Sequence, residues 1–158
     1  MKVKIVYEDK VLEFDGDVEE VYKQIISFFN KVIPAFELAN KILVNIDIND
    51  LVNILQPYLQ ISREGDMIFT ENGEALSMSN KIVVLLIGAK LLNALGIRQV
   101  DSLSLHEISQ YIASTSKSVS SRLSELYSKG FVERYKEEGT VKYRVTLKGI
   151  VYFSRKLI

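Results

Sequence analysis

The first fifteen residues alternate between apolar and polar side chains, which is the pattern of a β-hairpin. The segments KVKIVY (2–7) and VLEF (11–14) flank the polar stretch EDK and predict two short strands joined by a turn. After them, Asp17 and Glu20 stand at the spacing of a helix capping box. Apolar residues then recur at helical spacing over 18–32, so a helix is expected to follow the hairpin.

The pattern breaks at Pro34, which lacks an N–H and is expected to kink this helix or to begin a second one. DINDLVNILQPYLQI (47–61) predicts another short helix, disturbed at Pro57. REGD (63–66) and ENGE (71–74) are turn signals, and MIFT between them predicts a strand. Residues 1–76 are therefore expected to form a small α+β unit whose aromatic stripe is core, a ligand pocket being the less favoured alternative. After Pro34 an apolar stripe continues with Phe36, Ala39, Ile42 and Leu43.

From Ser77 the chain changes character. SMSNKIVVLLIGAKLLNALG (77–96) begins with serine caps and ends at Gly96, as a helix does, and it is apolar nearly all round. Such a helix needs partners on more than one side. One side can be covered by its own domain, and the other by the N-terminal unit or by a second chain.

The segment ASTSKSVSSRLSELYSKGFVERY (113–135) holds seven serines and one threonine before Gly130, a composition that also suits a solvated linker. A linker would not maintain an apolar stripe, however, and this segment has one at i, i+4, i+7 and i+8. We expect a helix with Thr115 as its N-cap and Gly130 at its end, and with serines on its outer face. The stripe consists of Val119, Leu123, Leu126 and Tyr127.

A shorter helix precedes this one. SLHEISQYI (104–112) opens on a capping box formed by Ser104 and Glu107, and ASTS connects the two helices, which predicts a helix-turn-helix. FVERYK (131–136) and VKYRVT (141–146) flank the turn EEG and predict a hairpin, and a final short helix closes the chain. This order of elements predicts a winged helix over residues 77–158.

LSLHEISQYIASTSKSVSSRLSELYSKGFVERY, followed by KYRVTLKG, resembles the winged helix-turn-helix domains of archaeal and bacterial transcription regulators. The resemblance covers about residues 77–158 and is most specific in KSVSSRLSELYSKGFVER. Two positions depart from it: Ala113 where many members have glycine, and Ser109 where many have alanine. An alanine at 113 is strained if that position needs a positive φ. The resemblance implies that the second helix enters the major groove of DNA.

The outer face of the second helix carries hydroxyl and basic side chains. Serines let a helix backbone approach DNA closely, and Lys and Arg attract phosphates. The hairpin, or wing, adds basic side chains, although Glu137 and Glu138 at its tip would repel a phosphate backbone. The predicted DNA contacts are Thr115, Lys117, Ser118, Ser121, Arg122, Ser124, Arg134, Lys136, Lys142 and Arg144.

The formal net charge of zero hides an asymmetry. Residues 1–76 contain 7 Lys and Arg against 14 Asp and Glu, whereas residues 77–158 contain 13 against 6. An acidic half joined to a basic half suggests that the basic half meets a polyanion. The plainer alternatives are that the two halves attract each other, or that the charges only solubilise the surface.

Several classes of function are disfavoured. The chain has no cysteine and a single histidine, His106, so neither a thiolate nor a multi-histidine metal site is expected. No nucleophile–histidine–acid set can be proposed except around the isolated His106, and there is no glycine-rich phosphate loop, so we expect neither an enzyme nor a cofactor. The strand-like start lacks the apolar core of a signal peptide, and IVVLLIGA (82–89) is too short to span a bilayer. We expect a cytoplasmic protein.

The favoured hypothesis is a dimeric, sequence-specific transcription regulator that binds double-stranded DNA. A homodimer could form through the apolar helix at 79–95, unless residues 1–76 cover that helix within one chain. The alternative is a winged helix that makes protein contacts in a larger assembly, favoured by the acidic wing tip and the neutral net charge. Residues 1–76 are the expected dimerisation or regulatory unit, and could meet a protein partner or an effector.

Overall fold

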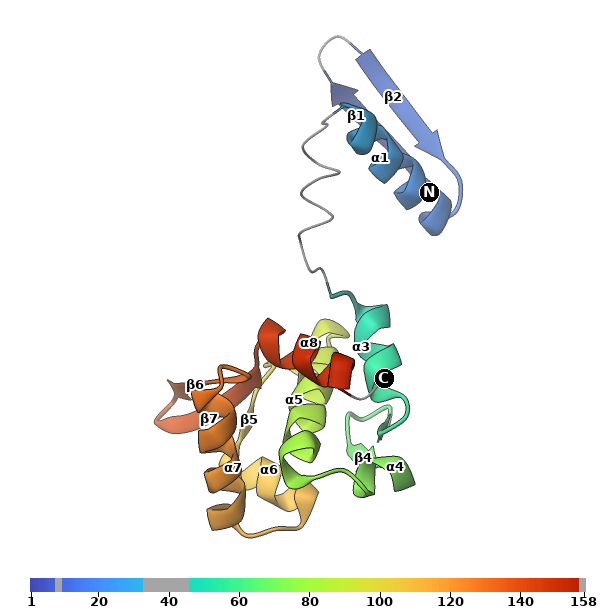
Figure 1. Ribbon diagram of the computed structural model, residues 1–158. Helices are drawn as coiled ribbons and strands as arrows, with labels where there is room; N and C mark the ends of the chain where they lie inside the picture. The colour runs from blue at the N-terminus through green and yellow to red at the C-terminus, as the bar shows by residue number, and fades with distance from the viewer. Residues whose placement is uncertain (8–9, 33–45, 157–158) are drawn as a thin grey trace. The chain divides into compact units, whose positions relative to one another are not determined.

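The computed structural model describes residues 1–7, 10–32 and 46–156, and the chain divides into two compact units, 1–45 and 46–158 (Figure 1). Helices and strands occur in both units, which confirms the α+β class. The division falls between Asn45 and Ile46 rather than between residues 76 and 77, because residues 46–76 pack on the same core as the elements that follow them. The helix break predicted at Pro34 and the apolar stripe after it lie outside the described residues.

The first unit contains the predicted hairpin and helix. Strands β1 (Lys2–Tyr7) and β2 (Lys10–Asp15) pair antiparallel, and they are followed by α1 (Val18–Val32). The Glu20 N–H donates a 2.8 Å hydrogen bond to the Asp17 carboxylate, which caps the start of α1 as predicted. Val21 is fully buried on this helix.

The second unit begins with α3 (Ile48–Leu55), β3 (Leu59–Ile61), β4 (Met67–Phe69) and α4 (Glu71–Glu74). The helix predicted near Leu51 and the strand predicted in MIFT are confirmed. The segment ENGE is a single helical turn rather than an open turn, which corrects the prediction. The reason is a cap: the Thr70 hydroxyl accepts the N–H of Gly73 at 3.1 Å.

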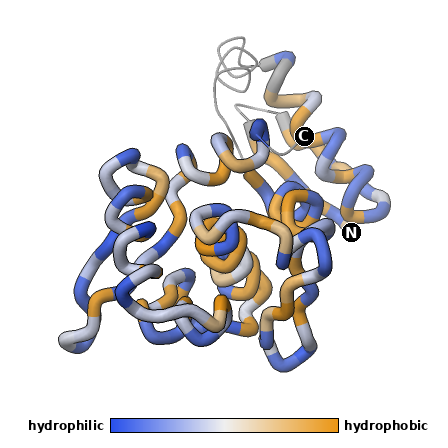
Figure 2. The backbone as a smooth tube through the Cα atoms, turned by 60° about the horizontal axis from the view of Figure 1, so that its bottom comes forward, coloured by the Kyte–Doolittle hydropathy of each residue, from blue (hydrophilic) through white to orange (hydrophobic). Residues whose placement is uncertain are grey.

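Helix α5 (Met78–Ala94) runs through the middle of this unit (Figure 1). Ser77 caps its start, and Gly96 follows its end with φ +73°, as predicted. Figure 2 shows how hydrophobic this central helix is. Its buried apolar residues lie on all sides: Ile82, Val83, Val84, Leu85, Leu86, Ile87, Ala89, Leu91 and Leu92.

One chain supplies both covers of α5. Leu51, Leu55, Leu59 and Met67 pack in the same core as the later elements, and a Cβ on Gly88 would lie 2.7 Å from the Met67 sulfur. The later elements cover the remaining sides. The apolar side chains of α5 are therefore buried within the chain, as in the alternative that the N-terminal part covers the helix: residues 46–76 are the cover.

The rest of the unit holds three helices and a three-stranded antiparallel sheet in the order β5-β7-β6. The predicted helices and hairpin are confirmed, whereas the two-residue strand β5 was not predicted. Glu138 and Gly139 both have positive φ and form the two-residue turn of the hairpin. The elements are β5 (Leu103–Ser104), α6 (Leu105–Ile112), α7 (Ser116–Ser128), β6 (Val132–Glu137), β7 (Thr140–Val145) and α8 (Leu147–Lys156).

Candidate nucleic-acid interface

Helix α7 is built as the sequence predicts. The Thr115 hydroxyl accepts the N–H of Ser118 at 3.3 Å, and Gly130 ends the helix with φ +75°. Val119, Leu123 and Leu126 are buried against the core. These contacts hold α7 firmly and leave its other sides open to solvent.

Tyr127 differs from its prediction as a member of the buried stripe, because its side chain is 44% exposed. At i+8 from Val119, it lies about 80° around the helix from that residue. Its ring lies 4.4 Å from the guanidinium of Arg134 on β6, measured to the ring centroid. Tyr127 therefore links the flank of α7 to the hairpin rather than filling the core.

The exposed side of α7 brings the predicted helix residues together. Thr115, Lys117, Ser118, Ser121, Arg122 and Ser124 are all exposed. The Arg122 guanidinium donates to Glu125 at 2.9 Å, so this cation already has an acidic neighbour on its own helix. The face combines two cations with several hydroxyl groups, all on one rigid element.

An open hollow of about 610 Å³ lies beside this face, between the first half of α7 and the start of α5. It brings together Lys117, Arg122 and hydroxyl groups from both helices. Sequence reasoning assigned the serines of α5 only to helix capping, since nothing in the sequence shows that the two helix starts are neighbours. The lining residues are Ser77, Met78, Ser79, Lys117, Ser118, Ser121 and Arg122.

The hairpin places its four predicted cations in different surroundings. Glu133 accepts a 2.8 Å hydrogen bond from Arg144, and this bond raises the pKa of the guanidinium. Lys142 lies 3.8 Å from Glu137. Lys136 is exposed, and Arg134 stacks on the Tyr127 ring. Two of these four cations are therefore paired with carboxylates of the same hairpin.

A partly buried network fixes α6, which packs against α7. Arg98 donates to the Glu107 carboxylate at 2.7 Å and to the Ser102 carbonyl at 3.0 Å. Partial burial opposes ionisation of Glu107, but hydrogen bonds from the Ser104 N–H and from Arg98 hold its pKa below the usual value. The capping box predicted at the start of α6 thus also anchors the preceding loop.

Other chemistry is sparse in the described part of the chain. His106 is exposed, and no group of three or more His, Asp or Glu residues in the described ranges is placed to hold a metal ion. Within those same ranges, no helix has both the length and the apolar character needed to cross a bilayer.

Comparisons with protein-family models, with curated proteins and with solved structures found no match to this chain.

Proposed function

We propose that residues 77–158 are a winged helix-turn-helix domain and that the protein binds double-stranded DNA as a transcription regulator. The element order supports this assignment: α5, β5, α6, a connection of three residues, α7, and then the β6–β7 hairpin. In this assignment α7 is the recognition helix and the hairpin is the wing.

The observation that carries the proposal is the composition of the exposed side of α7. A capped helix, held down by buried Val119 and Leu123, presents Lys117 and Arg122 among serine hydroxyls. Short hydroxyl groups allow close approach of the helix to base edges, while the cations neutralise phosphates. Serine has a low helix propensity, so a merely solvated face would gain little from so many serines.

Selection of bound duplexes from a randomised pool tests the proposal. A regulator that reads base edges enriches a short motif over successive rounds, and Ser121→Ala with Ser124→Ala changes the preferred base at one or two motif positions. Enrichment of no motif by wild-type protein, at salt concentrations where it binds duplex, would contradict the sequence-specific role.

A protein-interaction role for the winged helix is the second candidate, and the wing itself favours it. Glu133 and Glu137 neutralise two wing cations, and Glu138 adds another carboxylate at the tip. Such a surface suits a protein partner of mixed charge better than a phosphate backbone. Wild-type protein that binds no duplex even at low salt would favour this second role.

A further inference from the structure

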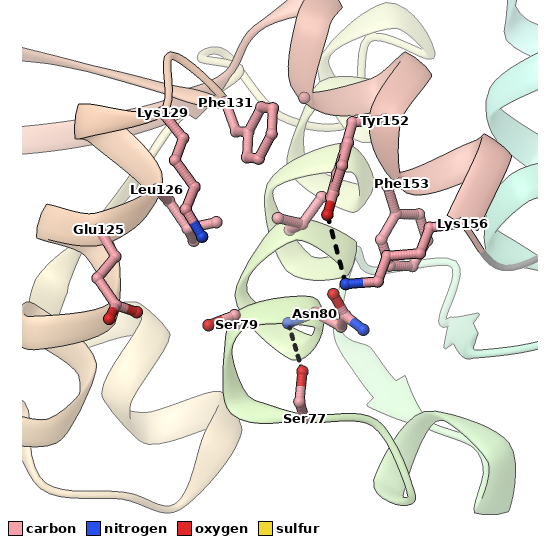
Figure 3. A pocket seen from close by; sticks show the side chains of 12 residues that line it. Ser77, Ser79, Asn80, Glu125, Leu126, Lys129, Phe131, Tyr152, Phe153 and Lys156 are labelled. Atoms are coloured by element: carbon pink, nitrogen blue, oxygen red, sulfur yellow. Dashed lines mark hydrogen bonds between the residues drawn. The ribbon is translucent and has the colours of Figure 1, made fainter.

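A second, smaller hollow adjoins the first and shares Ser77 and Ser79 with it; Figure 3 shows its lining. It measures about 200 Å³ and lies where the end of α7, the start of α5 and helix α8 meet. Lys129 and Glu125 reach it from α7, and Tyr152 and Lys156 reach it from α8 (Figure 3). The polar groups that α5 contributes belong to Ser77, Ser79 and Asn80.

The two hollows adjoin each other and are together named the groove. Both are lined by Ser77 and Ser79, so the start of α5 forms a shared wall. On α7, residues 118, 122, 125 and 129 are spaced at i, i+4, i+7 and i+11 and therefore follow one flank of the helix. Tyr127, two residues from Lys129, points to the opposite flank, where it contacts Arg134 of the hairpin. The groove thus runs along the side of α7 that faces away from the wing.

The lysines of the smaller hollow have no ion-pair partner among the described residues, whereas two cations of the wing have one. Among the described residues, no carboxylate forms an ion pair with Lys129 or Lys156, nor with the neighbouring Lys148 and Arg155. The carboxylate that lines the smaller hollow, Glu125, already accepts from Arg122. Lys129 and Lys156 therefore need no ion-pair exchange before they meet an anion, whereas Arg122 does.

Two aromatic rings hold the lysines in place. Phe131 and Tyr152 stack with ring centroids 4.4 Å apart at an interplanar angle of 20°. The ammonium of Lys148 lies 5.5 Å from the Phe131 centroid, and that of Lys156 lies 5.4 Å from the Tyr152 centroid. The Lys148 ammonium also donates to the Lys129 carbonyl at 2.8 Å. These contacts restrict the side chains of Lys148 and Lys156 before any ligand arrives, which lowers the entropy that they lose on binding.

We propose that this groove binds the sugar–phosphate backbone of one DNA strand, with Lys129 and Lys156 as phosphate contacts. The inference rests on the proposed function, since it assumes that α7 enters the major groove. A helix in that groove has a phosphate strand on each side. The wing stands on one side with half of its cations paired, and the Lys129–Lys156 groove stands on the other with its lysines unpaired. We therefore expect this groove to make more contacts to the DNA phosphates than the wing does.

A salt titration of the full-length protein tests the assignment. The probe is a fluorescently labelled 30-base-pair duplex of mixed sequence, followed by anisotropy between 50 and 200 mM KCl. The double variant Lys129→Gln with Lys156→Gln should flatten the dependence of log K on log salt by about two units, one for each phosphate contact. At 0.1 M salt its affinity should fall by roughly tenfold or more.

The matched control removes two positive charges elsewhere in the same unit: Arg63→Gln with Lys90→Gln. Arg63 is exposed in the turn before β4, and Lys90 lies ten residues along α5 from Asn80, about 15 Å away. The control should bind with a salt slope close to that of wild type. Thermal unfolding by circular dichroism checks that both variants remain folded.

The outcomes separate the two proposals. If Lys117→Ala weakens binding while the Lys129–Lys156 variant keeps the wild-type slope, the groove assignment is wrong and the recognition helix stands. If the matched control falls as far as the groove variant, the effect is one of net charge, and the assignment is also wrong. If wild-type protein binds no duplex at 50 mM salt, both proposals fail together.

Discussion

At the scale of single residues, Ala113 carries local backbone strain. It follows α6 with φ +54° and ψ +44°, the left-handed conformation that costs a residue with a Cβ roughly 1–2 kcal/mol. Its position, three residues before α7, makes this strain part of the connection between the two helices. The strain bears on stability alone, because Ala113 makes no predicted DNA contact.

Ala113→Gly should therefore stabilise the protein. Relief of the left-handed strain exceeds the entropy that glycine adds to the unfolded chain, about 0.5–1 kcal/mol. The net gain should be about 0.5–1 kcal/mol in the free energy of unfolding, measured by urea denaturation. Ala75→Gly is the matched control: Ala75 follows α4 with φ −73°, so glycine there should destabilise. A variant at 113 that is less stable than wild type would show that the connection is not strained.

The sequence predicted the backbone conformation of one of these residues correctly, but not the surroundings of two others. The departure at Ala113 flagged a possible positive φ, and the structure has one. Ser109 was flagged only as small, yet its buried hydroxyl has no hydrogen-bond partner among the described residues. Tyr127 was assigned to the core, but the periodicity of α7 cannot show how far around the helix the core extends. The outcomes at Ser109 and Tyr127 depend on how each side chain packs in the folded unit, which the pattern of one helix does not show.

At the scale of elements, the ion pair between Arg98 and Glu107 should make the free energy of unfolding depend on pH. The pKa of Glu107 is lowered in the folded protein, so the folded state favours the ionised carboxylate. The stabilisation is then present above the unfolded pKa and is lost as the pH falls through the folded value. Wild-type protein should lose stability below about pH 4.5.

Glu107→Gln isolates this contribution. The variant should be less stable than wild type at pH 7, by roughly 1–2 kcal/mol, because a charged hydrogen bond to Arg98 is replaced by a neutral one. The difference between the two proteins should shrink between pH 5 and pH 3, as followed by urea denaturation at each pH. A constant difference across that range would contradict the assigned role of the carboxylate.

Local signals predicted most elements, and the misses have a physical reason. Caps and a continuous apolar run were sufficient for α5, and caps with apolar periodicity for α6 and α7, because those signals lie within each helix. Strand β5 is two residues long and exists only through its pairing with Tyr143 and Lys142 on β7. No local pattern marks such a strand. Likewise, the groove beside α7 depends on the start of α5, which lies about forty residues earlier.

At the scale of the whole molecule, the main question that the sequence left open was which residues cover α5. Its apolar character on all sides predicted a cover but could not say whether one chain or two provides it. The structure gives the cover to residues 46–76 and so enlarges the second unit to 46–158. The acidic residues at 46–76 thus belong to the same unit as the basic face of α7. The apolar side chains of α5 are buried within the single chain.

The most direct test of the account is whether charge on the exposed face of α7 sets the affinity for duplex DNA. Lys117→Ala and Arg122→Ala, made separately, should each leave the unfolding temperature close to that of wild type, because both side chains are exposed. In an anisotropy titration of labelled duplex across a range of KCl concentrations, each should flatten the salt slope by about one unit. Arg122→Ala should lower the affinity less than Lys117→Ala does, because the Arg122 guanidinium must first leave Glu125 to contact a phosphate. Wild-type affinity and wild-type salt slope in both variants would remove α7 from the binding surface and contradict the central claim.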